Sequence, residues 1–215
     1  MREVPFYSNT EDNKSCYEAV LRMILKYYLP DKDFSWDELN KITGKKERLL
    51  TWPQYSYISM KNLGFEVKVI SAFDYDKFVK NGIKYIEEEY GKEIAKEQEK
   101  NCDIAYEIEN VKKLKNLIIK EERIPDIKDI CDLLTNNYLV KCGVNSKKLA
   151  GLDGYASHSI LIFEFDSKSL TLHDPGLPSR KSFRIDFDTF NQAWSYPNER
   201  AKDIAAFKLL KNNVI

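Results

Sequence analysis

SHSILIFEFDSKSLTLHDPG, residues 157–176, contains two apolar runs on either side of the polar triplet Asp166-Ser167-Lys168. Apolar runs of this length bounded by turn residues predict two strands joined as a β-hairpin. His158 begins the first strand and Asp174 follows the second, at nearly equal distances from the turn. Antiparallel pairing should therefore bring them close together, as a base and its orienting carboxylate need to be.

The segments around this hairpin predict helices first and an antiparallel sheet later, which is an α+β arrangement in a single domain spanning residues 1–215. We expect helices at 16–29, 36–42, 52–63, 127–134 and 187–194, and further strands at 65–70, 138–144 and 204–210. Ser-x-x-Glu or Thr-x-x-Gln patterns at Ser15, Ser35 and Thr51 indicate a capping box at the start of each of the first three helices. Pro30 and Gly44 follow the first two helices as stop signals.

Residues 75–122, called here the central segment, have a different composition. They are rich in Lys and Glu, contain Gly82 and Gly91, and lack proline. The apolar residues of its second half repeat at helical spacing, so the segment is interpreted as a helical hairpin inserted into the domain. A surface insertion packed on the domain is favoured over a lid or a partner-binding arm, because nothing in the segment specifies a ligand.

Cys16 is the cysteine with a chemically distinctive position. With Ser15 as N-cap it opens the first helix, where unpaired backbone N–H groups and the helix dipole favour an anion. A thiol in this position has a lowered pKa, and the thiolate is the nucleophile. Such a nucleophile needs a histidine that is oriented by a third group, for which His158 and Asp174 are the candidates. The alternative is that all three are ordinary core, strand and turn residues.

Composition excludes several other classes of function. The 34 basic and 34 acidic residues balance to a net charge of +0, which argues against a nucleic-acid or membrane-surface binder. No apolar run has the length of a signal peptide or a membrane span, so a cytoplasmic location is expected. Cys102, Cys131 and Cys142 form no Cys-x-x-Cys pair, so we expect no metal and no other cofactor, and these three cysteines should be small buried residues.

The two ends of the chain resemble a known family. Val4-Pro5-Phe6-Tyr7-Ser8, a polar loop, and Cys16 opening a helix resemble the start of the C39-like peptidases within the papain-like cysteine peptidase superfamily. Residues 157–162, Leu172-His173-Asp174-Pro175-Gly176, and the following Phe190 and Trp194 resemble the histidine strand, aspartate turn and next helix of that family. The resemblance covers residues 4–69 and 129–209 and implies a papain-like fold.

The resemblance also implies roles for individual residues. Cys16 would be the nucleophile, His158 the general base and Asp174 its orienter. The family usually has a glutamine before the cysteine as an oxyanion donor, and here Asn9 is the best match, with Asn13 as runner-up. The family also commonly has glycine after the cysteine, where this chain has Tyr17. Both departures bear on catalytic efficiency and leave the three triad positions filled.

Three functions follow from these residues. The first is a thiol hydrolase that cleaves a peptide or isopeptide bond of a peptide or protein substrate through an acyl-enzyme. The second is an acyl transferase or amidase with the same triad. The third is a catalytically degenerate module that binds a peptide. Family members joined to export transporters cut leader peptides, often after a double glycine, but a separate member need not share that substrate. The sequence leaves the oligomeric state open.

Overall fold

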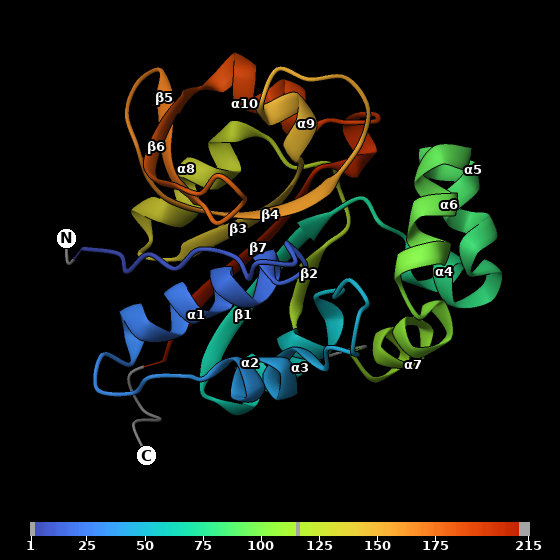
Figure 1. The fold of residues 1–215 in the computed structure, drawn as a ribbon, viewed down its shortest axis with the longest axis horizontal. Coiled ribbons are helices and arrows are strands. Elements are labelled where there is room, and N and C mark those ends of the chain that lie inside the picture. Colours follow the sequence, from blue (N-terminus) through green and yellow to red (C-terminus); the bar gives the residue numbers. More distant parts are fainter. Residues whose placement is uncertain (1–2, 115–116, 211–215) are drawn as a thin grey trace.

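The computed structural model describes residues 3–114 and 117–210 and confirms the α+β class. A twisted sheet runs through the molecule with helices on both of its faces, and a group of short helices stands to one side (Figure 1). The helices are α1 Cys16–Tyr28, α2 Trp36–Thr43, α3 Gln54–Asn62, α4 Tyr75–Asn81, α5 Ile83–Tyr90, α6 Lys92–Asn101, α7 Ile104–Leu114, α8 Ile127–Thr135, α9 Ser146–Leu149 and α10 Phe187–Trp194. The strands are β1 Phe65–Ser71, β2 Ile119–Glu121, β3 Leu139–Asn145, β4 Ser157–Phe165, β5 Ser169–Asp174, β6 Arg180–Asp186 and β7 Asp203–Leu209.

The sheet joins the two halves of the chain. Its strand order is β2-β1-β7-β3-β4-β5-β6, and every pair is antiparallel except β1 with β2. The last strand, β7, therefore lies between β1 from the first half and β3 from the second. Because side chains alternate across a strand, β4 sends Leu161 into the core beneath α1 and both Ile160 and Ile162 into the core beneath α8 and α10.

The first helix begins at the predicted residue, but the capping box predicted for its start is absent. Ser15 is the N-cap of α1, but its side chain makes no capping hydrogen bond. The third helix begins at Gln54 after Pro53, again without a side-chain cap, so the capping box expected at Thr51 is absent. The capping box of Ser35 with Glu38 is present, and Gly44 ends α2 in the left-handed conformation.

The central segment is not a helical hairpin. Within its described residues the chain forms four helices, α4 to α7, and the short strand β2, while residues 115–116 lie outside the described part. Gly82 and Gly91 separate α4, α5 and α6, with φ of 56° and 91° that other residues rarely adopt. The two glycines thus break what periodicity alone suggested to be longer helices.

The edge strand β6 and the helix α9 were also not expected from the sequence. Strand β6 has the sequence RKSFRID and is mostly exposed, so it lacks the apolar alternation of a core strand. The helix α9 has only four residues.

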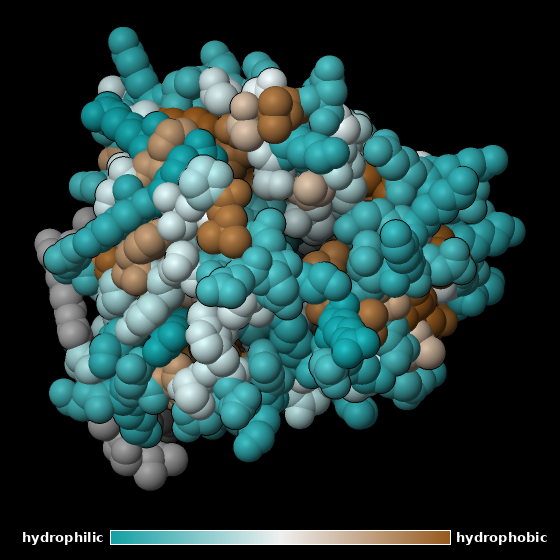
Figure 2. All heavy atoms as spheres, viewed as in Figure 1, coloured by the Kyte–Doolittle hydropathy of each residue, from teal (hydrophilic) through white to brown (hydrophobic). Residues whose placement is uncertain are grey.

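The face drawn in Figure 2 is mainly hydrophilic, with hydrophobic residues in separate patches. Among the described residues, none of the helices has both the length and the apolar character needed to cross a bilayer.

Candidate active site

Cys16 is the first residue of α1 and is half-buried. As the first helical residue it has a backbone N–H without an intrahelical acceptor. The His158 side chain and the backbone N–H of Ser159 lie near its thiol and both lower its pKa. Residues from opposite ends of the chain therefore meet where α1 packs against β4.

His158 and Asp174 are brought together by the β4–β5 hairpin, as the sequence predicts. The imidazole Nε2 lies 2.7 Å from Asp174 Oδ1, and both residues are buried. Strand β5 pairs His173 with Leu161, and β4 contains a one-residue irregularity between Ile162 and Glu164. Asp174 and His158 are therefore diagonal neighbours rather than directly opposed. With Nε2 engaged by the carboxylate, Nδ1 remains for the thiol.

Arg180 is a site residue that the sequence analysis missed. It is the cross-strand partner of Asp174 on β6, and its Nε and Nη2 donate to Asp174 Oδ2 at 3.0 and 2.7 Å. The backbone N–H of Gly176 donates to Oδ1 at 2.8 Å. Each carboxylate oxygen thus has its own partners, which fixes the plane of the carboxylate against the imidazole. Because β6 was not recognised as a strand, nothing in the sequence pointed to this pairing.

The electrostatics of the three groups favour a charged pair. Burial raises the pKa of Cys16, but the hydrogen bond and charge of His158 outweigh it and hold this pKa below the ordinary thiol value. Burial lowers the pKa of His158, but the hydrogen bonds to Asp174 and Cys16 outweigh it and raise this pKa to about 10. Burial raises the pKa of Asp174, while His158 and Arg180 bring it down to about 2. The directions of these shifts favour a thiolate beside an imidazolium.

The other three cysteines differ from Cys16 in this respect. Burial raises the pKa of Cys102 to about 12, and it also raises the pKa of Cys131 and of Cys142. Cys102 and Cys142 are buried, as expected, but Cys131 is only half-buried, which corrects the expectation that it belongs to the core. All four cysteines are free. Within residues 3–114 and 117–210, no group of three or more metal-ligating side chains could hold an ion.

Asn9 and Asn13, the two candidates for an oxyanion donor, are hydrogen-bonded to each other. Asn9 Nδ2 donates to Asn13 Oδ1 at 2.7 Å, and Asn9 Oδ1 accepts from the backbone N–H of Ser15 at 2.7 Å. The backbone N–H of Asn9 donates to the carbonyl of Pro175 at 2.8 Å. Asn9 therefore bridges the start of α1 and the aspartate turn, and Asn13 supports its amide.

A buried ionic cluster behind Cys16 was also missed. Glu18, fully buried, accepts hydrogen bonds from the hydroxyls of Thr43 and Thr51 at 3.0 and 2.7 Å and lies 3.3 Å from Lys45 Nζ. Lys45 Nζ in turn donates to Ser15 Oγ at 2.8 Å. The side chains of Ser15, Glu18 and Thr51, which the sequence suggested as helix caps, are used here for tertiary contacts.

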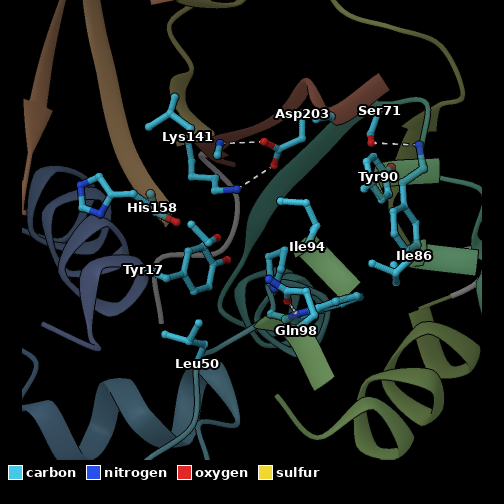
Figure 3. A pocket seen from close by; sticks show the side chains of 18 of the residues that line it. Tyr17, Leu50, Ser71, Ile86, Tyr90, Ile94, Gln98, Lys141, His158 and Asp203 are labelled. Atoms are coloured by element: carbon cyan, nitrogen blue, oxygen red, sulfur yellow. Dashed lines mark hydrogen bonds and ion pairs between the residues drawn. The ribbon is translucent and has the colours of Figure 1, made fainter. Parts of the chain in front are cut away.

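A cavity of about 240 Å³ begins beside the reactive pair. His158, Ser159 and Tyr17 line it on one side, and Ile86 and Ile94 of the central helices line it on the other. Figure 3 shows Tyr17 and the Lys141–Asp203 ion pair at the edge of this space, while the imidazole of His158 points away from it toward α1. The central segment is thus a wall of the cavity that adjoins the candidate catalytic residues.

Neither a family model nor a curated protein sequence matches the chain. Among solved structures it is similar to the peptidase domain of Streptococcus ComA, described as a bi-functional ABC transporter involved in a quorum-sensing pathway, with a TM-score of 0.53 and 13% sequence identity. The match covers 97% of this chain and 100% of that one. At this identity the likeness shows the fold alone, and it confirms the papain-like fold that the sequence resemblance implied.

Proposed function

We propose that the protein is a cysteine peptidase-like thiol hydrolase that cleaves an amide bond through an acyl-enzyme on Cys16. The observation that supports this most directly is the chain of contacts from the Cys16 thiol to His158 and on to Asp174. A thiol with a lowered pKa, paired to a histidine that a buried carboxylate orients, is the arrangement that nucleophilic catalysis needs. The fold shared with a peptidase domain agrees with this chemistry.

The reaction proceeds in two steps on these groups. The thiolate attacks the amide carbonyl, a carbon–sulfur bond forms, and the carbon–nitrogen bond breaks as the imidazolium of His158 gives its proton to the leaving amine. Neutral His158 then takes a proton from water, and the resulting hydroxide attacks the thioester and releases the acid. Asp174 keeps its charge throughout, because its pKa is about 2.

The negative charge on the carbonyl oxygen needs donors near Cys16. We assign this role to the backbone N–H of Cys16 and to the Asn9 amide. One hydrogen of Asn9 Nδ2 is held by Asn13, which leaves the other for an oxyanion. Loss of such a donor lowers the rate of a hydrolase by on the order of a hundredfold or more.

The test is the pH dependence of alkylation by iodoacetamide, followed at each cysteine by mass spectrometry. We expect Cys16 to react well below the pH at which half-buried Cys131 reacts, because only the Cys16 pKa is lowered. In His158→Ala the profile of Cys16 should move to higher pH, because burial still raises its pKa and the cation is gone. Each unit of this shift lowers the thiolate fraction about tenfold at a pH below the pKa.

Cys131 serves as the internal reference in both proteins, since His158 is not among the groups that shift its pKa and it should react identically in each. If Cys16 reacts no faster than Cys131 and the substitution changes nothing, the hydrolase proposal is wrong. The papain-like fold would then be better explained as a peptide-binding module, which needs no reactive thiol.

A further inference from the structure

Several aromatic side chains line the cavity beside His158. Trp52, Phe73, Tyr90, Tyr155 and Tyr196 are among the residues that line it. Trp52 stacks with Phe78 and meets Phe73 edge-on, and Tyr155 stacks on Tyr196, so the rings are held by one another. Aromatic walls of this kind favour a planar apolar group packed edge-to-face or in an offset stack.

One buried acceptor in this cavity has no partner. Gln54, the first residue of α3, is 6% exposed and lines the cavity, and its Oε1 has no hydrogen-bond partner among the described residues. A buried acceptor without a partner is costly in a folded protein, so its presence in a cavity indicates a ligand that brings a donor.

The charges that line the cavity are already compensated. Lys141 Nζ donates to Asp203 Oδ2 at 2.7 Å, and Asp203 Oδ1 accepts from the backbone N–H of Gly143 at 2.6 Å. Arg200 is paired with Glu89 and also donates to the carbonyl of Ala72. Asp203 is the acidic residue among the described residues that line the cavity, and both of its oxygens are engaged, so a Lys or Arg side chain of a ligand would find no free carboxylate there.

The size of the cavity fits a single aromatic side chain. A protein cavity of about 150 Å³ accommodates benzene, and the cavity here measures about 240 Å³. The remaining space suits the additional atoms of a phenol and its Cβ. An uncharged aromatic group with a hydroxyl would pack against the aromatic side chains and donate a hydrogen bond to Gln54 Oε1. It would also need no charged partner in the cavity.

We infer that this cavity is a specificity pocket for a tyrosine side chain of the peptide substrate, whose hydroxyl donates to Gln54 Oε1. The inference rests on the proposed function, because it places the pocket beside the bond that Cys16 would cleave. Phenylalanine would fill the same walls and leave Gln54 unpaired, and a buried acceptor that loses its partner typically costs about tenfold or more in affinity.

The test measures binding without catalysis. N-acetyl-tyrosine amide, N-acetyl-phenylalanine amide and N-acetyl-lysine amide are titrated into the full chain, and the shifts of the Trp52 indole and Gln54 amide signals are followed by NMR. We expect the tyrosine amide to bind about tenfold more tightly than the phenylalanine amide, and the lysine amide to bind most weakly. Gln54→Met keeps the length of the side chain and should remove the preference for tyrosine over phenylalanine, whereas Gln192→Met, the same change at an exposed position, should keep it.

Equal affinities for the tyrosine and phenylalanine amides, or a tyrosine preference that persists in Gln54→Met, would overturn the inference. The alkylation of Cys16 is measured on the same preparations, so the two proposals can fail separately. Fast, His158-dependent alkylation without a tyrosine preference rejects the pocket alone. A tyrosine preference with an ordinary Cys16 thiol keeps the pocket and rejects the hydrolase.

Discussion

Gly176 lies where any larger residue would touch Asp174 and His158. A Cβ atom at this position would stand 3.0 Å from Asp174 Oδ1 and 3.3 Å from both Cε1 and Nε2 of His158. Its backbone φ is not in the left-handed region, so alanine is excluded by contact and not by conformation. The small size of residue 176 is therefore a requirement of the site.

We expect Gly176→Ala to lower the rate of Cys16 alkylation at pH 7 by about tenfold or more, because a displaced Asp174 lets the pKa of His158 fall and that of Cys16 rise by a unit or more. Its effect on stability should be modest, since the added methyl group lies at the rim of the site. The measurements are the alkylation rate and urea denaturation of the same protein.

Gly151→Ala is the matched control. An added Cβ there meets no atom within 4 Å, but the φ of 71° penalises any side chain. This variant should lose about 1–2 kcal/mol of stability and keep the alkylation rate of Cys16. If the two variants behave alike, Gly176 has no particular role in the site.

Residue-level chemistry was predictable where it depended on local pattern. His158 and Asp174 could be paired because a short turn fixes which residues of a hairpin are neighbours. Arg180 could not, because its strand is polar and exposed and gives no periodic signal. The contact of Cys16 with His158 joins segments more than a hundred residues apart, so only the family resemblance suggested it.

At the scale of elements, the start of α1 is held by a tertiary cluster and not by its own caps. Glu18 is bound by Thr43 at the end of α2, by Thr51 before α3, and by Lys45 between them. A Ser-x-x-Glu pattern cannot reveal this, because the same side chains can cap a helix or reach another element. The position of Cys16 thus depends on three helices together.

Glu18→Ala should therefore destabilise the protein by about 3–5 kcal/mol, because it leaves Lys45 buried without its carboxylate. Urea denaturation measures the change. Asp33→Ala is the control, since Asp33 is exposed and its ion pair with Arg22 should contribute less than about 1 kcal/mol. A loss for Glu18→Ala as small as that of the control would show that the cluster does not anchor α1.

At the scale of the whole molecule, the strands of the sheet are packed against larger hydrophobic cores than the central helices are. Strands β3, β4 and β7 lie in the middle of the sheet with a core on each face. Helices α5 and α6 pack mainly against each other and α4, around a separate small cluster that includes Phe78, Tyr85 and Ile94. The sequence showed the helical character of this region but not its four-helix division or its place beside the site, since neither follows from periodicity.

This difference should appear in hydrogen exchange. Amides of β3, β4 and β7 should exchange only through global unfolding, whereas those of α5 and α6 should exchange through local opening at a free energy lower by several kcal/mol. These helices line the cavity with Ile86, Tyr90 and Ile94. N-acetyl-tyrosine amide should therefore slow exchange in α5 and α6, by a factor that depends on the ratio of its concentration to its Kd. Exchange in α5 and α6 as slow as in β7, or unchanged at saturating ligand, would mean that the central helices are a rigid part of the domain and do not close on a bound side chain.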